Sequence, residues 1–251
     1  MELFLLPSKI NYKKGSNANE AILEIEPLYF GYGTTIGNAL RRVLLSSLPG
    51  AAVTSVKIKG ADQEFSSVDN VKEDALNIML NLKNLRVKIH TDEPVVLTLK
   101  AKGEKVVTAK DISKNSDVEV VNTDLAIATL TDKKAELEME ITVQKGRGYL
   151  PVEERNKDDV TIGTMLVDAV FSPIRNVGYK VEHTRVGDIT DYDKLTMTIE
   201  TDGSITPQEA VEQSTEILIN HFQLLVNGKK QAEEPADASI EESEEATAEK
   251  E

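Results

Sequence analysis

One segment, residues 31–50, most constrains how this chain can fold. Its sequence, GYGTTIGNALRRVLLSSLPG, carries the signals of a single short helix with a defined start and end. Thr34 or Thr35 can cap the first turn with its hydroxyl, and Pro49 ends the helix because proline disfavours a helical residue before it. Apolar and small residues recur at the spacing of one helical face, which we expect to pack against the chain's own core: Ile36, Ala39, Leu40, Val43, Leu44 and Ser47.

The opposite face of this helix has an unusual composition. At about 100° per residue, Asn38, Arg41, Arg42 and Leu45 cluster on the side away from the apolar stripe. Arginine and apolar anchors ringed by polar groups are enriched at protein interfaces. The pattern therefore suggests a docking face, but by itself it leaves open a solvated face with one stray leucine.

Three glycines near the start of the helix raise an alternative function. Gly31, Gly33 and Gly37 have the spacing G-x-G-x-x-x-G, which is one residue longer than the dinucleotide-binding motif. No acidic residue at the end of a second strand completes such a unit. We expect the glycines to serve a tight turn and close packing, and we keep a nucleotide-binding enzyme using the Gly31–Gly37 loop as an alternative hypothesis.

Composition limits the remaining classes. The chain has 251 residues, no cysteine and a net charge of −14. There is therefore no disulfide framework or thiolate metal site, and no apolar run reaches the ~18 residues of a membrane span. The tail 231–251 carries nine acidic residues and one lysine, so the rest of the chain remains acidic, at −6. An acidic chain is a poor match for phosphate backbones, so we expect no direct nucleic-acid contact. Since the sequence has no membrane span and its first residues lack the basic region of a signal peptide, we expect no membrane association and a cytoplasmic location.

The first half of the chain is predicted to mix strands with one more helix. Glu2–Ile10 and Ala21–Glu26 are typical of strands around a polar turn, and Asp69–Leu82 is typical of an amphipathic helix capped by Asp69. Short β-rich runs follow, of which 135–143 alternates most regularly between apolar and acidic residues.

The C-terminal part returns to longer elements. Two antiparallel strands, Gly178–Gly187 and Lys194–Thr201, are predicted around a turn at 188–193. Thr206 and Glu209 form a capping box for a helix that runs to about Val226. Two apolar stripes lie along this helix, so the pattern leaves open a buried core helix or a dimer seam of the coiled-coil type. The first stripe comprises Val211, Thr215, Leu218, Phe222 and Leu225, and the second comprises Ala210, Ile217 and Leu224.

No catalytic constellation is evident in the sequence. His90, His183 and His221 lie far apart with no metal-ligand spacing, and no nucleophile elbow or P-loop is present. We expect no catalytic residue, cofactor or metal in this chain.

Several motifs together carry a resemblance. These motifs are EPLYFGYGTT followed by GNALRRVLLSSLPG, and EDALNIMLNLKNL (73–85), VQKGRGYLP (143–151), LVDAVFSPIRNVGY (166–179) and TPQEAV near Thr206. Through them, the sequence up to about Gly228 resembles the amino-terminal domain of the bacterial RNA polymerase alpha subunit family. The resemblance implies an α+β fold. Residues 1–49 and 174–229 would form a dimerisation domain, an antiparallel sheet with two packed helices. A β-rich domain, 50–173, would be inserted in it, and an acidic disordered tail, 230–251, would follow. The family usually has a small DNA-binding domain after such a linker; no segment of this sequence resembles it, which leaves open a truncated chain or a lineage without that domain.

The resemblance also implies a function and a set of contacts. The family forms a homodimer that scaffolds the beta and beta-prime subunits of DNA-directed RNA polymerase, a nucleotidyltransferase complex that also holds omega and sigma. The implied contacts are Asn38, Arg41, Arg42 and Leu45 for beta, and Lys83 and Val167 for beta-prime. The implied dimer interface comprises Ile36, Leu40, Leu44, Val211, Leu218, Phe222 and Leu225. A dimeric adaptor unrelated to polymerase remains a further alternative.

Overall fold

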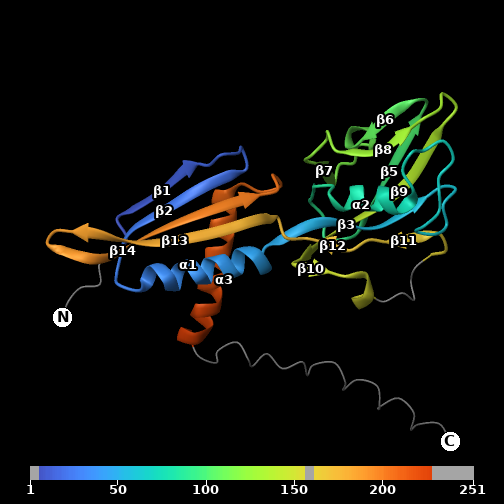
Figure 1. Cartoon of the computed structure of the whole chain (residues 1–251). Coiled ribbons are helices and arrows are strands. Elements are labelled where there is room, and N and C mark those ends of the chain that lie inside the picture. Colours follow the sequence, from blue (N-terminus) through green and yellow to red (C-terminus); the bar gives the residue numbers. More distant parts are fainter. Residues whose placement is uncertain (1–5, 156–160, 228–251) are drawn as a thin grey trace, which may run out of the picture. The chain divides into compact units, whose positions relative to one another are not determined.

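The computed structural model describes residues 6–155 and 161–227 (Figure 1). The chain divides after Ser214 into two units, and each is described by itself. The first unit combines antiparallel sheets with helices, which confirms the predicted α+β class.

Strands from both ends of the sequence form the first sheet. Its order is β1 (Lys9–Lys14), β2 (Glu20–Leu28), β14 (Ile189–Thr201) and β13 (Ile174–Val186), with each neighbouring pair antiparallel. The β13–β14 hairpin is longer and its turn tighter than predicted, because Gly187 takes a φ of +61° that a compact turn requires. One face of the sheet is apolar and buried, with Leu23, Ile25, Leu195, Met197 and Ile199. This face receives α1 (Tyr32–Ser46), which lies against β13 and β14.

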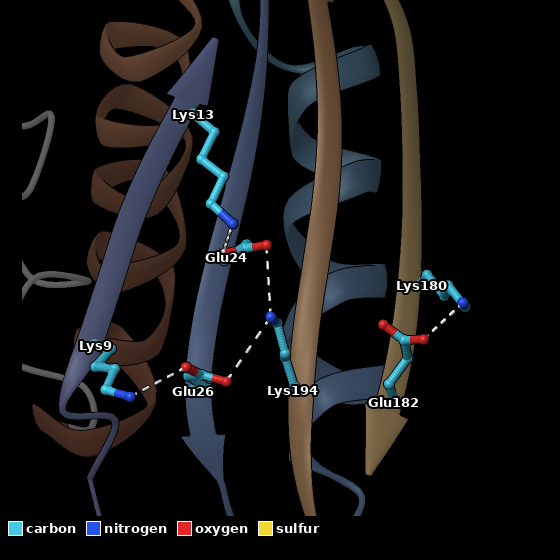
Figure 2. Close-up of polar contacts among 7 residues, drawn as sticks. All are labelled: Lys9, Lys13, Glu24, Glu26, Lys180, Glu182 and Lys194. Atoms are coloured by element: carbon cyan, nitrogen blue, oxygen red, sulfur yellow. Dashed lines mark hydrogen bonds and ion pairs between the residues drawn. The ribbon is translucent and has the colours of Figure 1, made fainter. Parts of the chain in front are cut away.

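The other face of this sheet carries a network of ion pairs, shown in Figure 2. Lys13 Nζ lies 2.7 Å from Glu24, Lys9 pairs with Glu26, and Lys194 of β14 lies between the two glutamates. A hydrogen bond from Lys13 lowers the pKa of Glu24. The predicted first strand, Glu2–Ile10, was misplaced, because Lys13 and Lys14 have the composition of a turn but belong to a strand that pairs along β2. Residues 2–5 of that prediction lie outside the described residues.

The middle of the chain forms a β-rich region with its own core. Its main sheet has the order β11 (Thr164–Leu166), β3 (Pro49–Ile58), β9 (Glu136–Arg147) and β5 (Val95–Lys102). Alternation along β9 is as predicted, with Leu137, Met139, Ile141 and Val143 buried in one large cluster. Two-stranded pairings complete the region: β4 (Val87–Ile89) with β7 (Val118–Val120), β6 (Lys105–Thr108) with β8 (Ala126–Leu130), and β10 (Tyr149–Leu150) with β12 (Ala169–Val170), together with the 3₁₀ turns η1 (Ala109–Asp111) and η2 (Val152–Glu154).

The second helix is shorter than predicted. Helix α2 spans Ala75–Lys83 and is capped by Asp74, whose Oδ1 accepts a hydrogen bond of 2.7 Å from the Asn77 N–H. Asp69 is not the cap, because the residues before Asp74 are tied to other segments: Ser67 bridges to Asp74 and Glu73 binds Thr129.

The last helix begins as predicted. Helix α3 spans Pro207–Asn227, and both hydrogen bonds of its capping box are formed. The Thr206 N–H donates to the Glu209 carboxylate, and the Glu209 N–H donates to the Thr206 hydroxyl. Within the described residues, no helix is both long and apolar enough to cross a bilayer.

Glu138 gives a testable expectation for the stability of the β-rich region. It lies on β9 and binds Lys100 of β5 and Lys59, which directly follows β3, and these two lysines lower its pKa from 4.5 to about 2. A carboxylate whose pKa falls on folding stabilises the fold above its unfolded pKa, and that stabilisation is lost as pH falls through the folded pKa. We expect Glu138→Gln to lower the urea midpoint at pH 7. The difference from the parent chain should then shrink between pH 4.5 and about pH 2. A difference that is constant with pH would contradict this assignment.

Candidate functional site

Helix α1 begins without a cap from its own sequence. Its N-cap residue is Gly31 in the left-handed region, with φ +79°, and no side chain caps the first turn from that position. The carboxylate of Asp193, on β14, instead accepts a 3.0 Å hydrogen bond from the Gly33 N–H and is buried. The predicted cap by Thr34 or Thr35 was wrong, since the Thr35 hydroxyl donates back to the Gly31 carbonyl. A residue 160 positions away therefore fixes where α1 starts.

The buried face of α1 is smooth enough to lie close to the sheet. Gly33, Gly37, Leu40 and Leu44 are the buried residues of the helix. A Cβ added at Gly37 would lie 2.8 Å from the Tyr179 side chain and 2.9 Å from the Leu195 side chain, so any larger residue would force these side chains or the helix to shift. The glycines thus serve the turn and the close packing. A phosphate at this helix start would meet the buried Asp193 carboxylate, which already occupies the Gly33 N–H.

The opposite face of α1 is exposed. Asn38, Arg41 and Arg42 are exposed, and Leu45 is 37% exposed although it is apolar. Arg41 Nε donates to the Val177 carbonyl of β13 at 3.2 Å, which orients its guanidinium along the edge of the helix. These four side chains, which we call the α1 face, lie together on one surface held by packing on the other side.

The predicted dimer residues separate into three groups by burial. Leu40, Leu44 and Val211 are buried within the single chain, and Ile36 and Leu218 are half-buried. The buried ones stabilise the protomer and offer no surface to a partner in this conformation. Phe222 and Leu225, in the second unit, are 58% and 79% exposed. They belong to an exposed apolar group on α3 that also includes Ile219, Leu224 and Val226.

The two residues predicted to contact beta-prime also differ in burial. Lys83, the last residue of α2, has a partly exposed side chain, whereas Val167 is buried in the core of the β-rich region. Val167 cannot contact a partner directly in this conformation, because its side chain is covered by its own chain. Its neighbour Asp168 pairs with Lys83 at 3.1 Å, and the ring of Tyr149 lies below the Lys83 ammonium. Sequence reasoning missed Asp168 and Tyr149; a single acidic residue inside the apolar run LVDAVF was the available signal.

Comparison with known proteins identifies the family. Residues 56–172 match the profile of the RNA polymerase Rpb3/RpoA insert domain. The DNA-directed RNA polymerase subunit alpha of Carboxydothermus hydrogenoformans is 54% identical over 208 residues, which is 83% of this chain and 66% of that protein. The Symbiobacterium thermophilum subunit is 54% identical over 84% of this chain and 66% of its own length. The Oceanobacillus iheyensis subunit is 52% identical over 84% of this chain and 67% of its own length.

These matches run across both the sheet with α1 and the β-rich region, and they span about two thirds of the length of the relatives. The insert-domain profile falls on the β-rich middle of the chain, where the structure has a separate core. With relatives more than half identical over most of its length, the chain belongs to the family of DNA-directed RNA polymerase alpha subunits.

Proposed function

We propose that this chain is an assembly subunit of DNA-directed RNA polymerase, which forms a homodimer and then binds the beta and beta-prime subunits. The observation that carries the proposal is the α1 face. Two arginines and a partly exposed leucine lie on a helix whose other side is fixed by glycine packing and by Asp193. Arginine and a central apolar side chain are typical anchors of protein interfaces.

The homodimer is supported by the exposed apolar side chains of α3. Phe222, Leu224, Leu225 and Val226 are each more than half exposed in the single chain. An exposed apolar group of this kind favours association. The first stripe of α3, from Val211 to Leu225, has apolar positions separated alternately by four and three residues, a spacing that is typical of paired helices. The resemblance to the alpha subunit family implies a homodimer, so we take a second copy of this chain as the partner of this surface.

Binding, and not bond making, is the role that we assign to this chain within the nucleotidyltransferase complex. In the proposed assembly, one copy presents its α1 face to beta and the other copy presents the Lys83 region to beta-prime. The same sequence thereby serves two unlike contacts, because each large subunit meets only one copy.

Truncation of Arg42 or Leu45 tests the beta contact. We expect Arg42→Ala and Leu45→Ala each to weaken capture of the beta subunit by about tenfold, since truncating a central anchor costs about 1–2 kcal/mol. The dimer should be unchanged, because both side chains lie on α1 and outside the exposed apolar group of α3 to which we assign the dimer contact. Arg185→Ala is the matched control, as Arg185 is an exposed arginine near the end of β13, outside the α1 face. Undiminished capture by both α1 variants would refute the assignment of this face.

A further inference from the structure

One carboxylate joins three segments of the β-rich region. Asp168 lies between β11 and β12, and its Oδ2 accepts a 3.1 Å hydrogen bond from Lys83 Nζ at the end of α2. Its Oδ1 accepts a 3.1 Å hydrogen bond from the Val152 N–H of η2. The hydrogen bonds from Lys83 and Val152 lower the pKa of Asp168, so the group is charged at neutral pH.

These contacts restrict a side chain that would otherwise be mobile. Lys83 Nζ lies 5.8 Å from the centroid of the Tyr149 ring, which is a cation–π distance. The Lys83 side chain is still 32% exposed. A free lysine has many rotamers, and fixing one of them on binding costs entropy. Here the ammonium is already held in one place and still reaches the surface.

The surface around Lys83 has a defined chemical character. Leu80 is one helical turn before Lys83 on α2 and is 51% exposed, and Tyr149 is 55% exposed. An acidic group flanked by apolar atoms on a partner would match this ammonium and its two apolar neighbours.

Arg155 gives a reason to expect that Asp168 also affects the stability of the fold. Arg155 Nη1 donates to the Thr54 carbonyl at 2.6 Å, but its Nε and Nη2 are buried without a hydrogen-bond partner within the described residues. Burial lowers the pKa of Arg155, and the charge of Asp168 opposes that shift. Neutralising Asp168 therefore removes a compensating charge near a partly buried cation, so any test must separate stability from docking.

We propose that Asp168 is a positioning residue for the contact between Lys83 and the beta-prime subunit, a proposal that depends on the function assigned above. Its carboxylate holds the Lys83 ammonium over Tyr149, where the ammonium binds an acidic group of the large subunit. Asp168 acts through Lys83 and does not contact the partner itself.

A double-mutant cycle tests this proposal. The variants are Lys83→Gln, Asp168→Asn and the two combined, each as full-length dimer already bound to beta, with the affinity for beta-prime measured by titration. We expect each single variant to bind about three- to tenfold more weakly. The double variant should bind no more weakly than Lys83→Gln alone, because Asp168 has no role once Lys83 is removed.

The controls separate docking from stability. Lys102→Gln and Glu136→Gln remove an exposed 2.6 Å ion pair in the same region and should leave beta-prime affinity unchanged. Asp168→Asn should lower thermal stability both in the parent chain and in the Lys83→Gln variant. It should lower the affinity for beta-prime only in the parent chain, where Lys83 is present.

Three outcomes would overturn the proposal, and they are distinguishable. Additive losses in the double variant would show that Asp168 acts through the fold or touches the partner itself. Unchanged affinity of Asp168→Asn, with Lys83→Gln weakened, would remove the role of Asp168 but keep the Lys83 contact. Unchanged affinity of Lys83→Gln would remove both the beta-prime contact and the positioning role.

Discussion

Replacing Phe222 and Leu225 together by glutamate should convert the dimer into monomers. Both side chains are more than half exposed in the single chain, so the substitution adds charge without disturbing the protomer. Association would bury two unpaired carboxylates in an apolar seam, and burying an unpaired charge is strongly unfavourable. Leu218 was an equally good candidate by spacing, but it is half-buried in the protomer, so Leu225 gives the cleaner test.

Light scattering at several protein concentrations measures this effect. The control is Gln208→Glu with Gln213→Glu, which adds the same number of carboxylates at exposed positions in the first two turns of α3, before the exposed apolar group begins at Ile219. The control should keep the mass of two chains. If the Phe222 and Leu225 variant also keeps that mass, α3 is not the dimer seam.

Gly37→Val should destabilise the protomer and weaken capture of beta at the same time. The first added carbon would lie within 3 Å of Tyr179 and Leu195, and the two methyl groups would increase the crowding. Overpacking a close contact costs about 1–3 kcal/mol, and relief of the crowding requires α1 to move away from β13 and β14. The α1 face moves with the helix, so its anchors lose their geometry.

Chemical unfolding and beta capture together check this prediction. Gly178→Val is the matched control, because a Cβ at Gly178 on β13 meets nothing within 4 Å and valine favours strands. The control should leave stability equal or higher. Equal stability of Gly37→Val and the parent chain would show that α1 does not need this close approach.

Local patterns predicted the elements whose signals lie within a few residues of one another. The capping box of Thr206 and Glu209, the alternation along β9 and the two faces of α1 were all readable in this way. Each depends on a period of 2 or 3.6 residues, or on a side chain that reaches its own helix start.

Interactions between distant segments could not be read from the sequence. Asp193 caps α1 from 160 residues away, and Lys13, which belongs to β1, pairs with Glu24 on the neighbouring strand. Strand register determines both, and no local pattern specifies which segments pair. Asp168 and Tyr149 were missed for the same reason, since α2, β10 and η2 meet only in the fold.

Apolar periodicity also could not tell what covers a side chain. Leu44, Val167 and Phe222 are equally apolar in the sequence, but the first two are buried in the protomer and the third is exposed. A helical stripe predicts that something covers it, either the chain's own sheet or a partner. Only the structure of a single chain separates the two cases.

The stoichiometry of the reconstituted assembly tests the proposed function most directly. The chain is mixed with the beta and beta-prime subunits, and the mass of the intact complex is measured by native mass spectrometry. We predict two copies of this chain with one beta and one beta-prime. A stable complex holding a single copy, or the absence of any complex with the large subunits, would contradict the proposal that one sequence serves two unlike contacts through its dimer.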